Sequence, residues 1–203
     1  MSDIYKILKD NFGYDSFRGE QESIINRITN ERKHSIVLMP TGSGKSLCYQ
    51  IPALYFENCT IVISPLIALM QDQVDVLRKK NISAAFINST LSKQEREKRL
   101  EQFVSGKIKL LYVTPERFRK PDFIEQINKV NIDLLAVDEA HCISEWGHDF
   151  RTSYLNLAKT IRKLCSNFRF LGLTATASIN VLNDLAALLK LNLSLPKYPL
   201  IYK

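Results

Sequence analysis

The sequence lacks the features that mark secreted, membrane-spanning or zinc-binding proteins. Its 203 residues include only four cysteines, and no two form a Cys-x-x-Cys pair. We therefore expect free thiols in a reducing compartment rather than a disulfide framework or a zinc site. No apolar run is long enough to cross a bilayer, and the first residues lack the apolar core of a signal peptide. These absences predict an intracellular protein of the cytoplasm, nucleoid or nucleus, with no zinc and no membrane partner.

Internal repeats, low-complexity segments and Pro/Gly-rich linkers are also missing. Hydrophobic residues make up 45% of the chain and charged residues 24%, an ordinary globular balance. The length suits one sizeable α/β domain. The formal charge of +7, from 28 Lys and Arg against 21 Asp and Glu, fits a polyanionic partner such as nucleic acid but does not by itself indicate one.

Short apolar runs alternate with longer helical patterns along the chain. Six runs are apolar on both faces and predict buried strands, at residues 35–39, 60–63, 84–87, 110–113, 134–137 and 170–173. Helices are expected over residues 66–80, 92–105 and 179–189, and the segment up to residue 30 is helical in pattern. This alternation predicts an α/β domain with a doubly wound, mostly parallel sheet and helices on both faces.

A glycine-rich turn follows the first predicted strand and opens a helix. It comprises Thr41, Gly42, Ser43, Gly44, Lys45 and Ser46. This is the context of a P-loop, whose backbone N–H groups surround phosphate oxygens at the positive end of a helix. Lys45 is expected to reach the β- and γ-phosphates, and the Ser46 hydroxyl to bind Mg²⁺. Met39 stands where the strict pattern has glycine.

Two carboxylates, Asp138 and Glu139, follow the apolar run at residues 134–137. The carboxyl end of a strand is where open α/β sheets bind their ligands, so we expect this pair beside the P-loop. Asp138 would hold Mg²⁺ through water, and Glu139 would orient and polarise the attacking water. His141 is a further candidate catalytic residue, although a lone histidine more often has a structural hydrogen-bonding role.

The order of short motifs resembles that of the RecQ family of DNA helicases. The similarity begins with Phe17-Arg18-Gly19-Glu20-Gln21 before the P-loop and continues through residues 64–73, 113–117 and 138–141. It includes the aromatic-rich segment at residues 142–151 and ends with residues 173–177. That aromatic-rich segment, directly after the acidic motif, carries the most specific part of the resemblance.

The resemblance implies a RecA-like P-loop NTPase domain that uses ATP and Mg²⁺ to move 3′ to 5′ on single-stranded DNA. It implies that Gln21 reads the adenine edge, that Tyr14 stacks on the base and that Arg18 helps to hold this pocket. DNA would be sensed by four residues of the aromatic-rich segment, Trp146, His148, Phe150 and Arg151. Thr174 and Thr176 would couple the nucleotide state to movement.

Three further residues just past predicted strand ends, Ser64, Thr114 and Arg117, are candidate contacts to DNA phosphates. Ordinary turn positions would explain them as well. The basic run at residues 93–99 alternates with glutamates and is expected to be a solvated helix face with i,i+4 ion pairs.

The expected organisation is a helical segment with the adenine motif at residues 1–30, a RecA-like ATP-binding domain at residues 31–195 and an exit tail at residues 196–203. The second RecA-like lobe of the family's motor is absent from this sequence and is an expected partner. Three alternatives stay open: an RNA helicase lobe, a non-catalytic regulatory module of the same fold, and a P-loop enzyme of another kind, such as a kinase.

Overall fold

The computed structural model describes residues 3–141 and 168–176, and its centre is one parallel sheet. The six strands follow the order β1-β6-β5-β2-β4-β3, and every neighbouring pair is parallel. The strands are β1 (Ser35–Leu38), β2 (Cys59–Ile63), β3 (Ala84–Ile87), β4 (Leu110–Val113), β5 (Ile132–Val137) and β6 (Arg169–Thr174). This sheet confirms the predicted α/β class, and all six predicted strands are present.

Helices connect the strands. They are α1 (Ile4–Ile7), the π-helix η1 (Leu8–Phe12), α2 (Gln21–Thr29), α3 (Leu47–Tyr55), α4 (Ile67–Lys79), α5 (Lys93–Val104), the 3-10 helix η2 (Pro115–Arg119) and α6 (Pro121–Ile127). The expected helices at residues 66–80 and 92–105 match α4 and α5 within a residue at each end. The expected helix at residues 179–189 lies outside the described residues.

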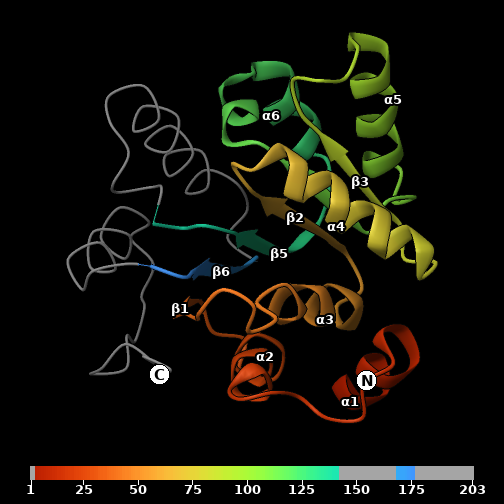
Figure 1. The fold of residues 1–203 in the computed structure, drawn as a ribbon. Coiled ribbons are helices and arrows are strands. Elements are labelled where there is room, and N and C mark those ends of the chain that lie inside the picture. Colours follow the sequence, from red (N-terminus) through yellow and green to blue (C-terminus); the bar gives the residue numbers. More distant parts are fainter. Residues whose placement is uncertain (1–2, 142–167, 177–203) are drawn as a thin grey trace.

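Two apolar clusters cover the two faces of the sheet, because alternate strand residues point to opposite sides. In β2, Ile61 and Ile63 pack with α5, η2 and α6, whereas Val62 packs with α1, α2, α3 and α4. Figure 1 shows α5 and α6 across the sheet from α2 and α3. Since both faces are covered, β2, β3 and β4 are buried at every position.

The α5 helix shows how the local sequence sets its start and its exposed face. The Ser92 side chain accepts a hydrogen bond from the Glu95 amide at 3.2 Å, as an N-cap does. Lys93 pairs with Glu97 at 3.7 Å, and Arg99 pairs with Glu95 at 3.0 Å, both with i,i+4 spacing. The solvated, ion-paired face expected of this run is therefore confirmed.

No helix among residues 3–141 and 168–176 has both the length and the apolar character needed to cross a membrane. Cys48 and Cys59 are free and buried, as expected for thiols that do not form disulfides. Cys142 and Cys165 lie outside the described ranges.

Candidate functional site

The carboxyl ends of β1, β6, β5 and β2 meet at one edge of the sheet, which we call the carboxyl edge. Backbone hydrogen bonds join the segments that leave these strands: the Met39 amide donates to the Thr174 carbonyl at 2.9 Å, and the Asp138 amide donates to the Ile63 carbonyl at 2.8 Å. The P-loop, the acidic pair and Thr174 are therefore brought together from three segments, the outer two of which are more than 130 residues apart in sequence.

The P-loop forms the turn between β1 and α3. Gly42 and Gly44 have φ angles of 79° and 78°, in the left-handed region that favours glycine. Within the described part of the chain, the backbone amides of Gly42, Gly44, Lys45 and Ser46 donate to no acceptor. The Ser46 hydroxyl makes no capping hydrogen bond to α3. Such a row of N–H donors at a helix N-terminus is a cradle for an anion.

Gln21, the first residue of α2, holds the P-loop from the side. Its side-chain amide donates to the Ser43 and Gly44 carbonyls, both at 3.1 Å, and its oxygen accepts from the Arg18 amide at 2.9 Å. Gln21 is only 2% exposed. A Cβ atom at Gly44 would collide with the Gln21 side-chain nitrogen, so this close approach requires glycine.

The other members of the expected adenine pocket lie next to this contact. The Arg18 guanidinium lies 5.9 Å from the centre of the Tyr14 ring, within cation–π range. Tyr14 is 48% exposed, so one face of its ring is open to a stacking partner. The structure thus brings Tyr14, Arg18, Gln21 and the P-loop together, as the resemblance implies.

Lys45 and Asp138 supply opposite charges to the same space. The Lys45 ammonium lies 3.4 Å from the Met39 carbonyl, which holds it only weakly. Asp138 is buried, and this burial, together with the Glu139 charge, raises the pKa of the Asp138 carboxyl. The Glu139 amide, which donates to Asp138 Oδ1 at 3.0 Å, and the charges of Lys45 and His141 act in the opposite direction. The carboxylate therefore favours a neighbouring cation.

Glu139 sits on a strained turn that ties β5 to β6. Its φ of 51° is in the left-handed region, which non-glycine residues rarely adopt. The following amide, of Ala140, donates to the Leu173 carbonyl at 2.8 Å. This turn aims the Glu139 side chain along the carboxyl edge, where its Oε2 lies 3.3 Å from His141 Nδ1.

His141, Thr174 and Thr176 form a chain of hydrogen bonds beside Glu139. The Thr174 hydroxyl donates to the Thr176 carbonyl at 2.9 Å and lies 2.7 Å from His141 Nδ1. Because that hydroxyl already donates its proton, we assign the proton of the His141 contact to Nδ1. The predicted catalytic His141 and the predicted coupling residues are therefore in direct contact.

The three candidate phosphate contacts lie further along the same edge: Ser64 directly follows β2, Thr114 directly follows β4, and Arg117 lies in η2. The Ser64 amide donates to the Val113 carbonyl at 3.1 Å, and the Arg117 amide donates to the Thr114 carbonyl at 3.1 Å. Ser64 and Thr114 are buried, whereas Arg117 is half-buried against the Phe123 ring, at 5.6 Å. The Arg117 Nε atom has no hydrogen-bond partner among the described residues. The structure groups these residues, and their contact with DNA stays a prediction.

The remaining four DNA candidates fall outside the described residues. They are Trp146, His148, Phe150 and Arg151.

A buried polar network was missed by the sequence reasoning. Gln50 on α3 donates to Gln73 on α4 at 2.8 Å and to the Tyr112 hydroxyl on β4 at 3.4 Å, and Tyr49 packs edge-on against Tyr112. The signal was a single amide in the apolar run at residues 47–54, since a buried amide needs partners. The network joins the helix that follows the P-loop to both segments that carry Ser64 and Thr114.

Comparison with known proteins agrees with this geometry. The family model of the DEAD/DEAH box helicases matches residues 18–185. The chain therefore belongs to the DEAD/DEAH box helicase family.

Within that family the chain is RecQ-like. It is 50% identical over 179 residues to the ATP-dependent DNA helicase RecQ of Bacillus subtilis (strain 168), covering 88% of this chain and 30% of that protein. It is 45% identical over 192 residues to the protein of the same name from Haemophilus influenzae, covering 95% of this chain and 30% of that protein. The chain thus spans about 30% of the length of these curated relatives.

Solved structures support the fold. The chain superimposes on Mss116p bound to ssRNA and AMP-PNP with a TM-score of 0.73 at 17% identity, covering 93% of this chain and 41% of that one. It matches the DUF1998 helicase MrfA bound to DNA with a TM-score of 0.72 at 20% identity, covering 93% of this chain and 28% of that one. At these identities the likeness establishes a helicase-type domain fold.

Proposed function

We propose that this chain is the first motor lobe of an ATP-dependent DNA helicase of the RecQ type. The observation that carries the proposal is the row of P-loop amides without acceptors, next to the buried carboxylate of Asp138. Such a pairing of anion donors with a buried acid suits the phosphates of a nucleotide and their metal ion. The 50% identity to a RecQ helicase supports ATP and DNA as the ligands.

In this proposal the P-loop holds the phosphates. The amides of Gly42, Gly44, Lys45 and Ser46, with the exposed Thr41, surround the phosphate oxygens, and the Ser43 hydroxyl would join them by leaving the Pro40 carbonyl, to which it donates at 2.6 Å. The Lys45 ammonium can turn from the Met39 carbonyl to the β- and γ-phosphates, because at 3.4 Å the existing contact is weak.

The residues present fit Mg²⁺. Mg²⁺ in nucleotide enzymes is held by one or two protein oxygens together with phosphates and waters. The uncommitted Ser46 hydroxyl and the Asp138 carboxylate supply that oxygen set. When bound, the ion would neutralise charge on the phosphates.

Glu139 orients and polarises the water that attacks the γ-phosphate. Its turn is fixed by the Ala140–Leu173 hydrogen bond, and its carboxylate lies beside His141. His141 links this carboxylate to Thr174 and Thr176, so a change at the γ-phosphate would reach the end of β6. We propose this chain of contacts as the coupling element of the lobe.

Tyr14, Arg18 and Gln21 form the adenine pocket. Tyr14 offers its open ring face, and Arg18 supports that ring. Gln21 already uses its amide hydrogens on the Ser43 and Gly44 carbonyls. Reading adenine would therefore exchange at least one of these hydrogen bonds, which ties base recognition to the P-loop.

Single-stranded DNA would lie across the ends of β2 and β4. Ser64, Thr114 and Arg117 would contact phosphates there, with Trp146, His148, Phe150 and Arg151 sensing the strand. The 3′-to-5′ polarity, and a second RecA-like lobe that completes the ATP site, belong to the same proposal. So does the division into an adenine segment, a RecA-like domain and an exit tail, at residues 1–30, 31–195 and 196–203.

The decisive experiment measures ATP hydrolysis by the 203-residue chain with Mg²⁺, with and without single-stranded DNA. Glu139→Gln is the blank, and single-stranded RNA is the competing polymer. Binding of a fluorescent ATP analogue is measured in parallel. We expect analogue binding with little turnover, because an arginine finger from a second lobe contributes a factor of about 10³–10⁵ in such motors.

Each outcome has a defined meaning. Analogue binding that is lost in Lys45→Ala supports the nucleotide site. Binding that is unaltered in Lys45→Ala contradicts it and favours a regulatory module. Stimulation by RNA but not by DNA contradicts the DNA assignment, and efficient unwinding by this chain alone contradicts the need for a second lobe.

A further inference from the structure

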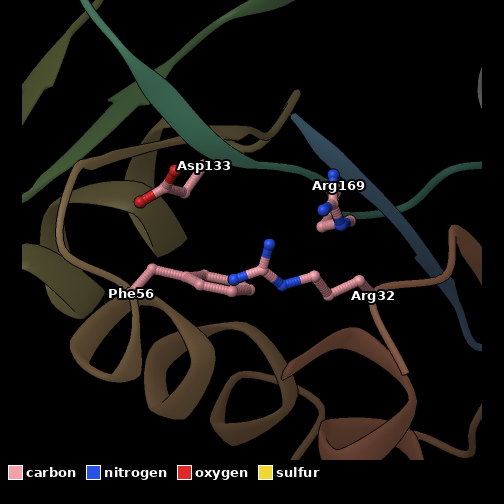
Figure 2. A pocket seen from close by; sticks show the side chains of 4 residues that line it. All are labelled: Arg32, Phe56, Asp133 and Arg169. Atoms are coloured by element: carbon pink, nitrogen blue, oxygen red, sulfur yellow. The ribbon is translucent and has the colours of Figure 1, made fainter. Parts of the chain in front are cut away.

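A second cavity lies at the opposite edge of the sheet, where the strands begin, which we call the amino edge. It has a volume of about 350 Å³ and is lined by Arg32, Phe56, Asp133 and Arg169. Figure 2 shows these side chains around one space: Phe56 and Asp133 at one end, Arg169 at the other, and the Arg32 guanidinium reaching in between. Arg32 precedes β1, Phe56 ends α3, and Asp133 and Arg169 lie at the starts of β5 and β6.

The acidic groups near this cavity already have partners. Glu31 pairs with Lys33 at 2.8 Å. Asp133 accepts from the Asn58 amide at 2.7 Å and from the Asn58 side chain at 3.2 Å. Among residues 3–141 and 168–176, no hydrogen bond or ion pair engages the Arg32 guanidinium. Within the described part of the chain, Arg32 is therefore a cation without an ionic partner at the cavity.

A second cation lies at the same cavity. Arg169 is partly buried, and this burial, followed by the positive charge of Arg32, lowers the pKa of the Arg169 guanidinium, against the opposing influence of Asp133. Two guanidiniums that repel one another form a site that an anion stabilises. One planar guanidinium can donate two parallel hydrogen bonds to two oxygens of a phosphate. Such a site therefore selects its ligand by geometry as well as by charge.

We propose that the amino-edge cavity binds a nucleoside phosphate, with its phosphate between Arg32 and Arg169 and its base beside Phe56. The Phe56 ring supplies an aromatic surface for a planar base. The Asp133 carboxylate lies at the base end, and since a carboxylate has more lone pairs than its two hydrogen bonds from Asn58 use, it can accept from an exocyclic amino group. No residue of the P-loop takes part.

The volume and the charge of the amino-edge cavity favour some nucleotides over others. A volume of about 350 Å³ is at the small end for ligand pockets, which suits one nucleotide unit. The described lining residues, two guanidiniums and one carboxylate, carry a net charge of +1, which suits one phosphate better than a triphosphate. This preference is the reverse of that expected at the P-loop, which has donors for several phosphates.

A phosphate with an attached nucleoside can come from two sources, a free mononucleotide and a nucleotide unit within single-stranded DNA. The test therefore uses AMP, inorganic phosphate and a short oligodeoxyadenylate as separate probes. The ¹⁵N-labelled 203-residue chain is titrated while the arginine Nε–H signals are followed by NMR, because these signals report each guanidinium separately from the P-loop.

The variant is Arg32→Gln, which removes an exposed charge with little risk to folding. The control is Lys98→Gln on the exposed face of α5, which changes the net charge equally at a distant site. We expect AMP to shift the Arg32 and Arg169 signals in a saturable way. Affinity at Arg169 should fall about tenfold in Arg32→Gln, the effect of losing one charge-assisted hydrogen bond, and stay unchanged in Lys98→Gln.

A second variant, Phe56→Leu, tests the base contact. It should weaken AMP binding and leave inorganic phosphate binding unchanged. Displacement of AMP by oligodeoxyadenylate would identify the DNA strand as a source, and its absence would identify free nucleotides. The proposal is overturned by equal shifts with AMP and with chloride at the same ionic strength, or by AMP affinity that is the same in Arg32→Gln.

Discussion

The Lys109 contacts at the amino edge and the P-loop at the carboxyl edge treat their polar groups in opposite ways. At the amino edge the Lys109 ammonium lies within 2.6–2.7 Å of three carbonyls, of Phe56, Glu57 and Asn58, and so ends α3. Asn58 in turn donates to Asp133. At the carboxyl edge, by contrast, the P-loop amides of Gly42, Gly44, Lys45 and Ser46 and the Ser46 hydroxyl have no acceptor among the described residues. Satisfied groups stabilise a fold, whereas unsatisfied ones in a rigid frame are ready to bind.

This contrast predicts that substitutions at the two edges separate stability from nucleotide binding. The largest effect is expected for Lys45→Ala. It should weaken binding of a fluorescent ATP analogue by at least about 100-fold, because charge-assisted hydrogen bonds to two phosphates are lost. The thermal midpoint should barely move, since Lys45 makes only a 3.4 Å contact in the fold. A large fall in the midpoint would contradict the contrast.

The opposite result is expected for Lys109→Met at the amino edge. It keeps the aliphatic stem but leaves three carbonyls without their donor, so the free energy of unfolding should fall by about 2 kcal/mol in urea denaturation. Analogue affinity should stay within twofold. Lys107→Met, two residues earlier and exposed, is the matched control and should change neither quantity.

Gly44→Ala tests the contact between Gln21 and the P-loop. The left-handed φ of 78° should cost about 1 kcal/mol of stability with any side chain. Gly106→Ala, with a φ of 74° and open space around it, should cost the same. Only Gly44→Ala displaces Gln21, so only it should also weaken analogue binding, about tenfold, as for the loss of one good hydrogen bond. Equal affinities in the two variants would show that the Gln21 contact is dispensable.

A smaller effect is expected in the pH dependence of stability. Burial and Glu139 raise the pKa of Asp138 in the folded chain above that of the unfolded chain. The folded state therefore keeps its proton longer, and stability falls as pH rises from the unfolded pKa through the folded one. Asp138→Asn removes this loss, so its melting temperature should exceed that of the parent at pH 7, and the gap should close at lower pH.

The exposed Asp75→Asn on α4 is the control and should show no such trend. A gap for Asp138→Asn that is independent of pH would mean that altered packing, rather than protonation, causes the change.

The sequence was most informative where one segment determines its own structure. The strands were predicted because runs such as residues 60–63 are apolar on both faces, and both faces are indeed covered. The P-loop was predicted from its glycines, and the acidic pair from its place after a strand. By contrast, α6 and η2 are short and depend on packing such as that of Phe118 against Phe123, at 5.4 Å, so no periodic pattern indicated them.

The partners of individual side chains were beyond the reach of the sequence. Gln21 reaches carbonyls 22 and 23 residues away, and Gln50 reaches a tyrosine 62 residues away. The amino-edge cavity takes its four lining residues from four separate segments, so no local pattern could have located it. Such contacts follow from the strand order, which a single sequence does not specify.

That strand order also affects how the chain is made. Among the described strands β1 pairs only with β6, and β6 lies between β1 and β5, so the last described strand of the chain joins β1 to the rest of the sheet (Figure 1). While the chain emerges from the ribosome, β1 has no neighbour and β5 keeps an open edge until residues 169–174 arrive. Open strand edges promote aggregation, and such long-range pairing is slow. Until then the Met39 amide also lacks the Thr174 carbonyl to which it donates, so the frame that holds the P-loop is incomplete.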